Sequence, residues 1–160
     1  MNCREKSDLE LARKAVNLYQ KKGNDFAFEH CSLFIKTCNK FGEPKVAADV
    51  ICQTGHRLGA WVSLRSITYL IKELADRGEY ATIIDLFITV AMKDPKRFNT
   101  YSYFEMLLVH ASQGNSSELH EFALGRAAKH LGSDAVERLK TAYPAPATKV
   151  EGESVATAIN

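Results

Sequence analysis

The stretch LIKELADRGEYATIIDLF, residues 70–87, contains the pattern that decides the fold. Apolar residues at helical spacing stand on both sides of its glycine, Gly78, and they are Ile67, Leu70 and Ile71 before it and Ile83 and Leu86 after it. Such spacing places side chains on one face of a helix. A chain that reverses between two helices commonly needs one left-handed residue, and glycine adopts that conformation without steric cost. The stretch therefore predicts two antiparallel helices that turn at Gly78.

The same pattern recurs in register on both sides of this stretch. Glycines stand at Gly42, Gly78 and Gly114, 36 residues apart. The apolar positions that recur with them are Cys31, Phe34, Ile35, Ala47 and Val50 around the first glycine, and Tyr103, Met106, Leu107, Leu119 and Phe122 around the third. Pro44 suits the first turn of a helix, and NSSE at 115–118 is typical of a capping box. Each unit is therefore predicted to hold a helix, a glycine turn, a second helix and a longer connector.

Extension of the pattern to both ends predicts the fold class and the domain boundaries. We expect helices near residues 8–22, 26–41, 43–56, 64–77, 79–92, 100–113, 115–130 and 134–142, the first opened by a capping box in SDLE at 7–10 and the last by DAVE at 134–137. Together they predict an all-α fold, a right-handed α-solenoid of antiparallel helix-turn-helix repeats with a period of 36 residues. The repeat domain is expected over 1–142, with units near 8–25 (partial), 29–64, 65–100 and 101–136 and then a short terminal helix. Residues 143–160, rich in Ala, Thr, Pro and Glu, are expected to form a flexible tail.

The first expected helix resembles the second helix of a unit whose first helix is missing. Its candidate partner-contact residues are Leu11, Ala15, Leu18 and Tyr19. A helical hairpin cannot bury its apolar stripe alone and depends on the next hairpin for cover. We therefore expect either upstream repeats or another protein subunit of a larger assembly against this helix.

Composition narrows the class of protein. A chain of 160 residues that is 46% hydrophobic and 25% charged has the make-up of an ordinary globular domain with one core. Because no run of 18 apolar residues exists, we expect no membrane insertion. No targeting sequence is visible at the N-terminus. A net charge of +2 falls short of the strongly basic balance of an autonomous nucleic-acid binder.

No pattern of catalytic or metal-binding residues stands out. The cysteines are Cys3, Cys31, Cys38 and Cys52, and the histidines are His30, His56, His110, His120 and His130. The absence of a CxxC pair favours free thiols in a reducing compartment over a zinc site or a disulfide. The sequence shows no nucleophile motif and no phosphate-binding loop. We therefore expect a non-catalytic protein with no cofactor, no metal site and no small-molecule substrate.

Residues 70–87 resemble the pentatricopeptide repeat (PPR) family. The PPR pattern runs Leu-Ile, then a glycine that closes the first helix, then Leu-Phe two turns into the second, as at 70–71, Gly78 and 86–87. The unit 65–100 matches best, and the resemblance covers residues 10–136. Tetratricopeptide repeats are the second choice, because their period is shorter and their glycine lies inside the first helix. A generic helical hairpin repeat is a further alternative.

The PPR resemblance implies a protein of mitochondria or plastids that binds single-stranded RNA or is built into an organellar ribosome. In RNA-reading members a few side chains of each repeat recognise one base. The matching first-helix positions are Leu33, Tyr69 and Glu105, and the matching repeat-end positions are Leu64 and Thr100. None forms the expected pair of Thr, Asn or Ser with Asp or Asn. The resemblance thus implies RNA contact through the backbone and its shape rather than base reading.

Charge and aromaticity single out the candidate RNA-contact residues Lys36, Lys40, Arg65, Tyr69, Lys72 and Arg77. The cations would contact phosphates and the tyrosine would stack on a base. Because Glu73, Asp76 and Glu79 stand among them, a solvated mixed-charge surface is the alternative. Two functions stay open: an RNA-associated scaffold in a mitochondrial ribosome or RNA-processing assembly, and a protein scaffold or accessory subunit without RNA contact. The family implies a mitochondrial location, with plastid or cytoplasm as alternatives.

Overall fold

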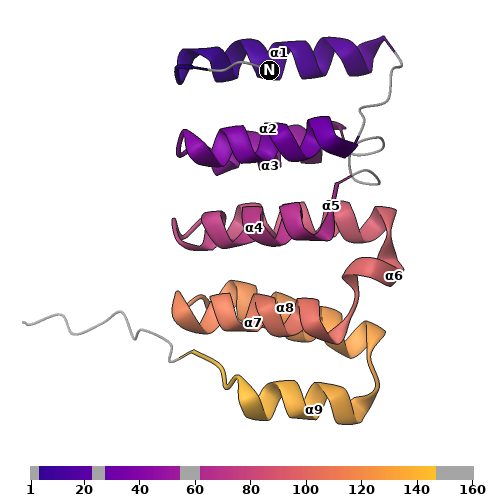
Figure 1. Ribbon diagram of the computed structural model, residues 1–160. Coiled ribbons are helices and arrows are strands. Elements are labelled where there is room, and N and C mark those ends of the chain that lie inside the picture. The colour runs from indigo at the N-terminus through magenta and orange to yellow at the C-terminus, as the bar shows by residue number, and fades with distance from the viewer. Residues whose placement is uncertain (1–3, 23–27, 55–61, 147–160) are drawn as a thin grey trace, which may run out of the picture.

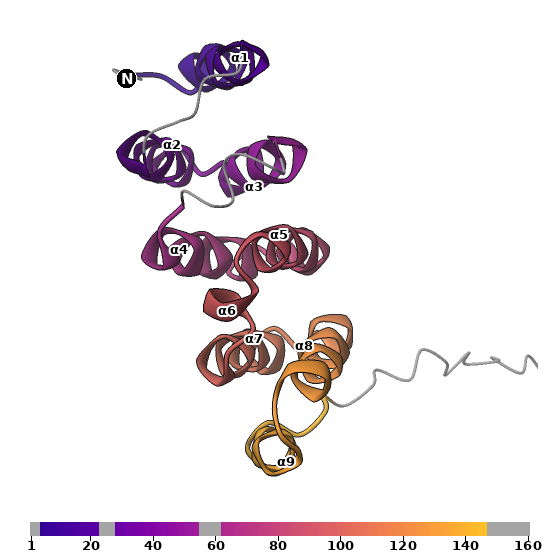
Figure 2. The same cartoon turned by 90° about the vertical axis from the view of Figure 1, so that its right-hand side faces the viewer.

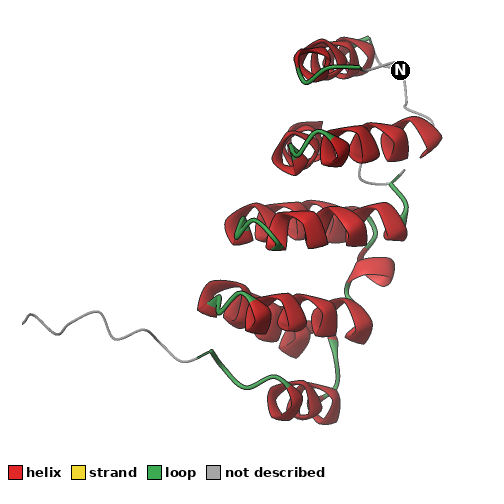
Figure 3. Cartoon of the chain, turned by 60° about the vertical axis from the view of Figure 1, so that its left-hand side comes forward, coloured by secondary structure: helices red, strands yellow, loops and turns green. Residues whose placement is uncertain are grey.

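The computed structural model describes residues 4–22, 28–54 and 62–146, and within these ranges the chain contains helices and no strand (Figure 3). The predicted all-α class is confirmed. The helices are α1 (Ser7–Lys21), α2 (Phe28–Lys40), α3 (Pro44–Thr54), α4 (Leu64–Ala75), α5 (Tyr80–Lys93), α6 (Pro95–Phe98), α7 (Tyr101–Gln113), α8 (Ser117–His130) and α9 (Ser133–Ala142). The expected helix start at 26, the expected end at 56 and the tail from 147 onward lie outside the described residues.

The helices are arranged in layers that follow one another along one direction (Figure 1). α2 pairs with α3, α4 with α5, and α7 with α8, while α1 lies at one end and α9 at the other (Figure 2). The short turns inside the pairs lie at one edge of the stack, and the link from α5 through α6 to α7 lies at the opposite edge. This arrangement leaves the first helices α2, α4 and α7 side by side along one face.

Two of the three expected glycine turns are confirmed. Gly42 and Gly78 both have φ +73°, in the left-handed region. At each turn the next residue bonds back to a carbonyl five positions earlier: Glu43 N donates to Cys38 O at 2.9 Å, and Glu79 N donates to Leu74 O at 3.0 Å. A left-handed residue followed by this hydrogen bond is the Schellman motif, which commonly ends a helix.

The prediction for Gly114 is wrong, because the left-handed residue of the third turn is Asn115, with φ 51°. The backbone N of Ser116 then donates to Ala111 O at 2.9 Å, as in the other two turns. Gly114 instead leaves space for a neighbouring side chain. A Cβ there would lie 1.5 Å from the hydroxyl oxygen of Tyr80, so the tyrosine occupies the space of the missing side chain.

The expected capping boxes are also replaced by other caps. Ser116 caps α8, since its hydroxyl accepts from Leu119 N at 3.3 Å. At the start of α1 the carboxylate of Asp8 accepts from the backbone N of Arg4 and Glu5, at 2.8 and 3.0 Å. α9 follows Gly132, which offers no side-chain cap. Each expected capping box contains more than one side chain that can accept a hydrogen bond. The sequence pattern alone does not show which of them caps the helix.

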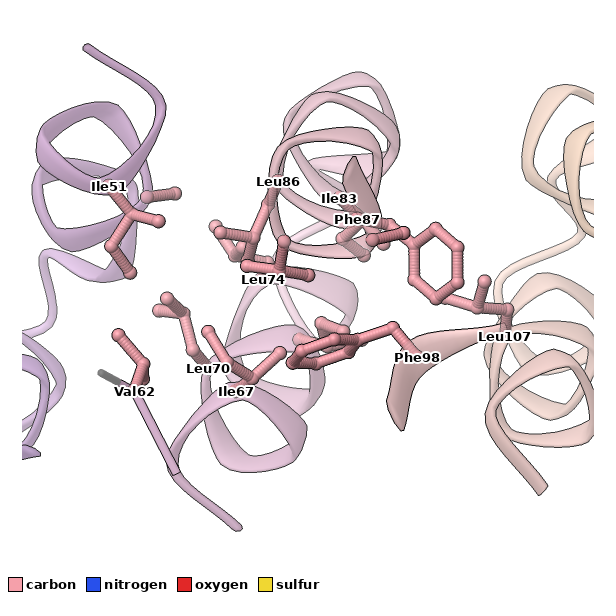
Figure 4. Packing of buried hydrophobic residues seen from close by; sticks show 14 of the residues in the cluster. Ile51, Val62, Ile67, Leu70, Leu74, Ile83, Leu86, Phe87, Phe98 and Leu107 are labelled. Carbon is pink, nitrogen blue, oxygen red and sulfur yellow. The ribbon is translucent and has the colours of Figure 1, made fainter. Parts of the chain in front are cut away.

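The periodic apolar positions form one buried cluster. All of those predicted from the repeat are buried except Met106 and Phe122, which pack half-buried against it. Figure 4 shows Leu70 and Leu74 of α4 beside Leu86 of α5, the packing that a helical hairpin needs. No described helix is long and apolar enough to cross a membrane.

The four-residue helix α6 was not predicted. Asp94 caps it, with its carboxylate accepting from Arg97 N at 3.3 Å, and Pro95 occupies its first position. Its last residue, Phe98, is fully buried and points toward Ile67 of α4 (Figure 4). A helix of one turn is too short to show a period, so the sequence pattern placed these residues in a connector.

Candidate nucleic-acid interface

A groove of about 740 Å³ lies between the first helices α2 and α4. The residues that line it are Glu29, Ser32, Leu33, Ile35, Lys36, Ser63, Arg65, Ser66 and Tyr69. Three of the six predicted RNA-contact residues, Lys36, Arg65 and Tyr69, are therefore brought together. They come from two helices that are separated in sequence and adjacent in space.

Hydroxyl groups connect the two helices within the groove. Ser63 caps α4 by accepting from Ser66 N at 2.9 Å. Its hydroxyl donates to the Ser66 hydroxyl at 2.8 Å, which in turn donates to the Ser32 hydroxyl at 3.1 Å. With this direction of donation, the Ser32 hydroxyl accepts from Ser66 and can donate its own proton to a ligand. Small hydroxylated side chains also keep α2 and α4 close while filling little volume.

Two cations flank these serines. Lys36 of α2 and Arg65 of α4 are both exposed, and neither forms an ion pair with any described residue. The lining includes one acidic residue, Glu29. An unpaired lysine and arginine on opposite walls suit a ligand that carries more than one anionic group, because each cation keeps its full charge for the ligand.

Tyr69 and Leu33 supply apolar surface at the same place. Their exposed fractions are 45% and 42%, high for side chains of this size. An aromatic ring with an open face is a stacking platform for any base, because every base has a π-face. The groove thus combines cations, hydroxyl groups and one accessible ring.

The other three predicted RNA-contact residues do not line the groove. Lys72 bonds the carboxylate of Asp76 at 3.0 Å, and this contact raises the pKa of the lysine. Lys40 lies 5.6 Å from the ring centre of Phe41. The guanidinium of Arg77 reaches the turn at Gly42, where it would be 3.3 Å from a Cβ. Each of these cations therefore already has a neighbour within the chain.

The predicted partner-contact residues lie on α1, away from this groove. Leu11, Leu18 and Tyr19 are 66%, 60% and 45% exposed, and Ala15 is exposed as well. No described helix covers that side of α1, which contacts α2 and α3 through its other face. The chain thus presents two separate surfaces: the groove, where cations and hydroxyl groups stand beside apolar side chains, and the apolar side of α1.

Titratable groups outside the groove include two cysteines and the histidine of a second, smaller cleft. Burial raises the pKa of the Cys31 thiol to about 11 and also raises the pKa of Cys52. Burial lowers the pKa of His110, which lies in a smaller cleft of about 300 Å³ with Asp76 and Tyr80. Within the described ranges, no three His, Cys, Asp or Glu side chains lie close enough together to hold a metal ion.

Sequence reasoning missed Ser32, Ser63 and Ser66. One signal was available, since Ser63 stands immediately before the apolar run that begins at Leu64 and a serine there is a typical helix cap. The Ser66 to Ser32 contact had no signal, because it joins residues 34 positions apart on two helices.

The chain matches no protein-family model, no curated protein sequence and no solved structure. Its function is therefore inferred from its own residues.

Proposed function

We propose that the chain is a non-catalytic PPR-like scaffold that contacts single-stranded RNA through its backbone, as part of an organellar assembly such as a mitochondrial ribosome or an RNA-processing complex. In this proposal the helical pairs are units of a right-handed α-solenoid with a 36-residue period, and the face of the first helices carries the RNA. The observation that supports it best is the groove between α2 and α4, where Lys36, Arg65 and Tyr69 converge.

The chemistry of that groove favours backbone contact without base reading. Lys36 and Arg65 would each neutralise one phosphate, and the Ser32 hydroxyl would donate to a phosphate or sugar oxygen. Tyr69 would stack on a base at a gain of about 1–3 kcal/mol, with little preference among bases. Leu33 offers no hydrogen bond. Binding should therefore be weak and insensitive to sequence.

The experiment is a salt titration of binding to short single-stranded RNAs of different sequence. With two phosphates neutralised, log K against log salt should have a slope of about −1.4, from about 0.7 per contact. The double variant Lys36→Ala with Arg65→Ala should flatten this slope. Replacement of Lys129, an exposed cation on α8 far along the chain from the groove, is the matched control and should leave it unchanged.

Two results of the titration would contradict this proposal. Tight binding to one RNA sequence that persists at high salt would contradict backbone recognition. A slope that the double variant does not change would remove the groove from the interface.

The second candidate function is a protein scaffold or accessory subunit without RNA contact. The observation that favours it is the exposed apolar side of α1, with Leu11 and Leu18 largely open to solvent. Purification of the protein with its complex, before and after nuclease treatment, distinguishes the two functions. An association that survives nuclease, in a protein that binds no RNA at any salt, would favour this second function.

A further inference from the structure

α1 has two apolar sides, and only one of them is covered by the described part of the chain. Leu9, Ala12 and Val16 are buried against the neighbouring helices. On the opposite side Leu11 and Leu18 are exposed. The helix at the other end of the stack, α9, differs: it buries Val136 and Leu139, and its exposed side chains are polar or small, at Asp134, Glu137, Arg138, Lys140, Thr141 and Ala142.

The exposed side of α1 is a continuous stripe. Leu11, Ala15 and Leu18 follow i, i+4, i+7 spacing, so they lie one above the other along the helix. The same line continues to Asp8 before them and to Lys22 after them, since Lys22 N still donates to Leu18 O at 3.2 Å. We call these five residues the outer stripe of α1. Lys14 lies beside the stripe, about as far round the helix from Leu11 as Asp8 does on the other side, and its long stem allows its charge to reach water at the rim of a contact.

The outer stripe is nearly symmetric about Ala15 in side-chain size, and its two ends carry opposite charges. Asp8 and Lys22 stand seven residues to either side of Ala15, and the two leucines stand four and three residues away. In an antiparallel pair related by a two-fold axis at Ala15, Leu11 of one helix would lie within about 1.5 Å, along the axis, of Leu18 of the other. Asp8 would lie level with Lys22 at both ends.

We propose that the outer stripe of α1 binds the same stripe of a second copy of this chain in an antiparallel pair. A two-fold interface requires a surface that complements itself, with residue i against j and j against i. An unrelated partner would require no such symmetry. The small Ala15 at the centre allows the close approach of two helices, which lie about 8–10 Å apart when packed.

The pair should be weak and dependent on concentration. One helix face on each side buries less than the roughly 1,200 Å² of a standard interface, a size that is typical of weak encounters. We therefore expect a dissociation constant between about 1 μM and 1 mM. This surface is independent of the groove between α2 and α4, so loss of either activity leaves the other unaffected.

Sedimentation equilibrium of the full chain, across about three decades of concentration around that range, tests the proposal. Leu18→Glu would bury a charge in the interface and should raise the dissociation constant about 100-fold. Met92→Glu is the matched control, because Met92 on α5 is 69% exposed and lies off the stripe. A wild-type chain that stays monomeric throughout would overturn the proposal and assign the stripe to another protein or to further repeats. So would a dimer that Leu18→Glu does not weaken.

A charge exchange tests the antiparallel register. Asp8→Lys and Lys22→Asp should each weaken the dimer, because like charges then meet at both ends. A mixture of the two variants restores opposite charges at both ends, so a mixed dimer should form more tightly than either variant alone. Asp8 also caps α1 through Arg4 N and Glu5 N, but this cap is equally absent in the Asp8→Lys homodimer, so recovery on mixing reports only the pairing. A mixture that associates no better than its components would overturn the register.

Discussion

The two junctions that α4 makes with its neighbouring first helices differ in what fills them. Toward α2 the helices meet through small hydroxylated side chains, with Ser66 donating to Ser32, and a groove of about 740 Å³ remains. Toward α7 the one-turn helix α6 lies in between (Figure 2). There the rings of Phe98 and Tyr103 are 5.2 Å apart, and the Tyr103 hydroxyl donates to Leu64 O at 3.2 Å.

Single residues account for much of this difference. Phe98 lies 36 residues after Val62, and both are buried just before a first helix. The phenylalanine fills a volume that the valine cannot fill. Because protein interiors pack at crystal-like density, a few side-chain volumes decide whether two adjacent helices close on each other or leave a groove. The comparison shows that similar helical backbones can leave an open groove or form a solid core.

The largest expected effect comes from removing the ring of Phe98, which fills the junction between α4 and α7. Phe98→Ala should lower the free energy of unfolding by about 3–5 kcal/mol, because it leaves a cavity among aromatic neighbours. Val62→Ala should cost about 1.5 kcal/mol, from about 0.8 per buried methylene. Urea unfolding followed by circular dichroism measures both. Equal losses would mean that the two junctions are filled alike.

An intermediate effect is expected at the turn between α7 and α8, where Gly114 lies. Gly114→Ala places a Cβ on the Tyr80 hydroxyl and should destabilise the fold by about 1–3 kcal/mol. Gly125→Ala is the control: no atom lies near its added Cβ inside α8, so it should stabilise by about 0.5–1 kcal/mol. In a double-mutant cycle, Tyr80→Ala should remove most of the cost at Gly114. Additive losses would show that the tyrosine is not the obstacle.

The smallest effect concerns the hydrogen bonds across the two junctions. Tyr103→Phe removes the hydroxyl that bonds Leu64 O and Thr68, in a buried setting, and should cost near the top of about 0.5–1.5 kcal/mol. Ser66→Ala should cost near the bottom of that range, because water in the groove can bond the remaining hydroxyl of Ser32. Thermal melts of both variants provide the test. A larger loss at Ser66 would show that the hydrogen bond across the groove contributes more to stability than the one beside α7.

Periodicity predicted the buried faces well because burial repeats at the helical period. Ile67, Leu70 and Ile71 are fully buried as their spacing required. It could not predict α6, which is barely one period long, nor the role of Gly114, which depends on a contact with Tyr80, 34 residues away. Local pattern carries information about one helix at a time, whereas these features arise where two elements meet.

The candidate site was predicted in part for the same reason. Charge and aromaticity identified Lys36, Arg65 and Tyr69, which the fold does bring together. They equally identified Lys72, which the structure pairs with Asp76. Spacing of i, i+4 made that ion pair visible in the sequence, but spacing gives no reason to prefer it over a free lysine. Whether a lysine is paired within the chain or available to a ligand depends on where its side chain lies relative to the neighbouring helix.

The left-handed residue of the third turn comes 37 positions after that of the second, whereas the second comes 36 after the first. One added residue in the middle of a helix would rotate everything beyond it by about 100° and turn the buried face outward. The buried residues Phe104, Leu107 and Ala111 of α7 already come 37 positions after Ile67, Leu70 and Leu74 of α4, so the added residue lies in the link before α7. That link therefore absorbs a change in chain length without rotating either buried face. A single-residue insertion between Phe98 and Tyr101 should be tolerated, while the same insertion within α4 or α5 should not.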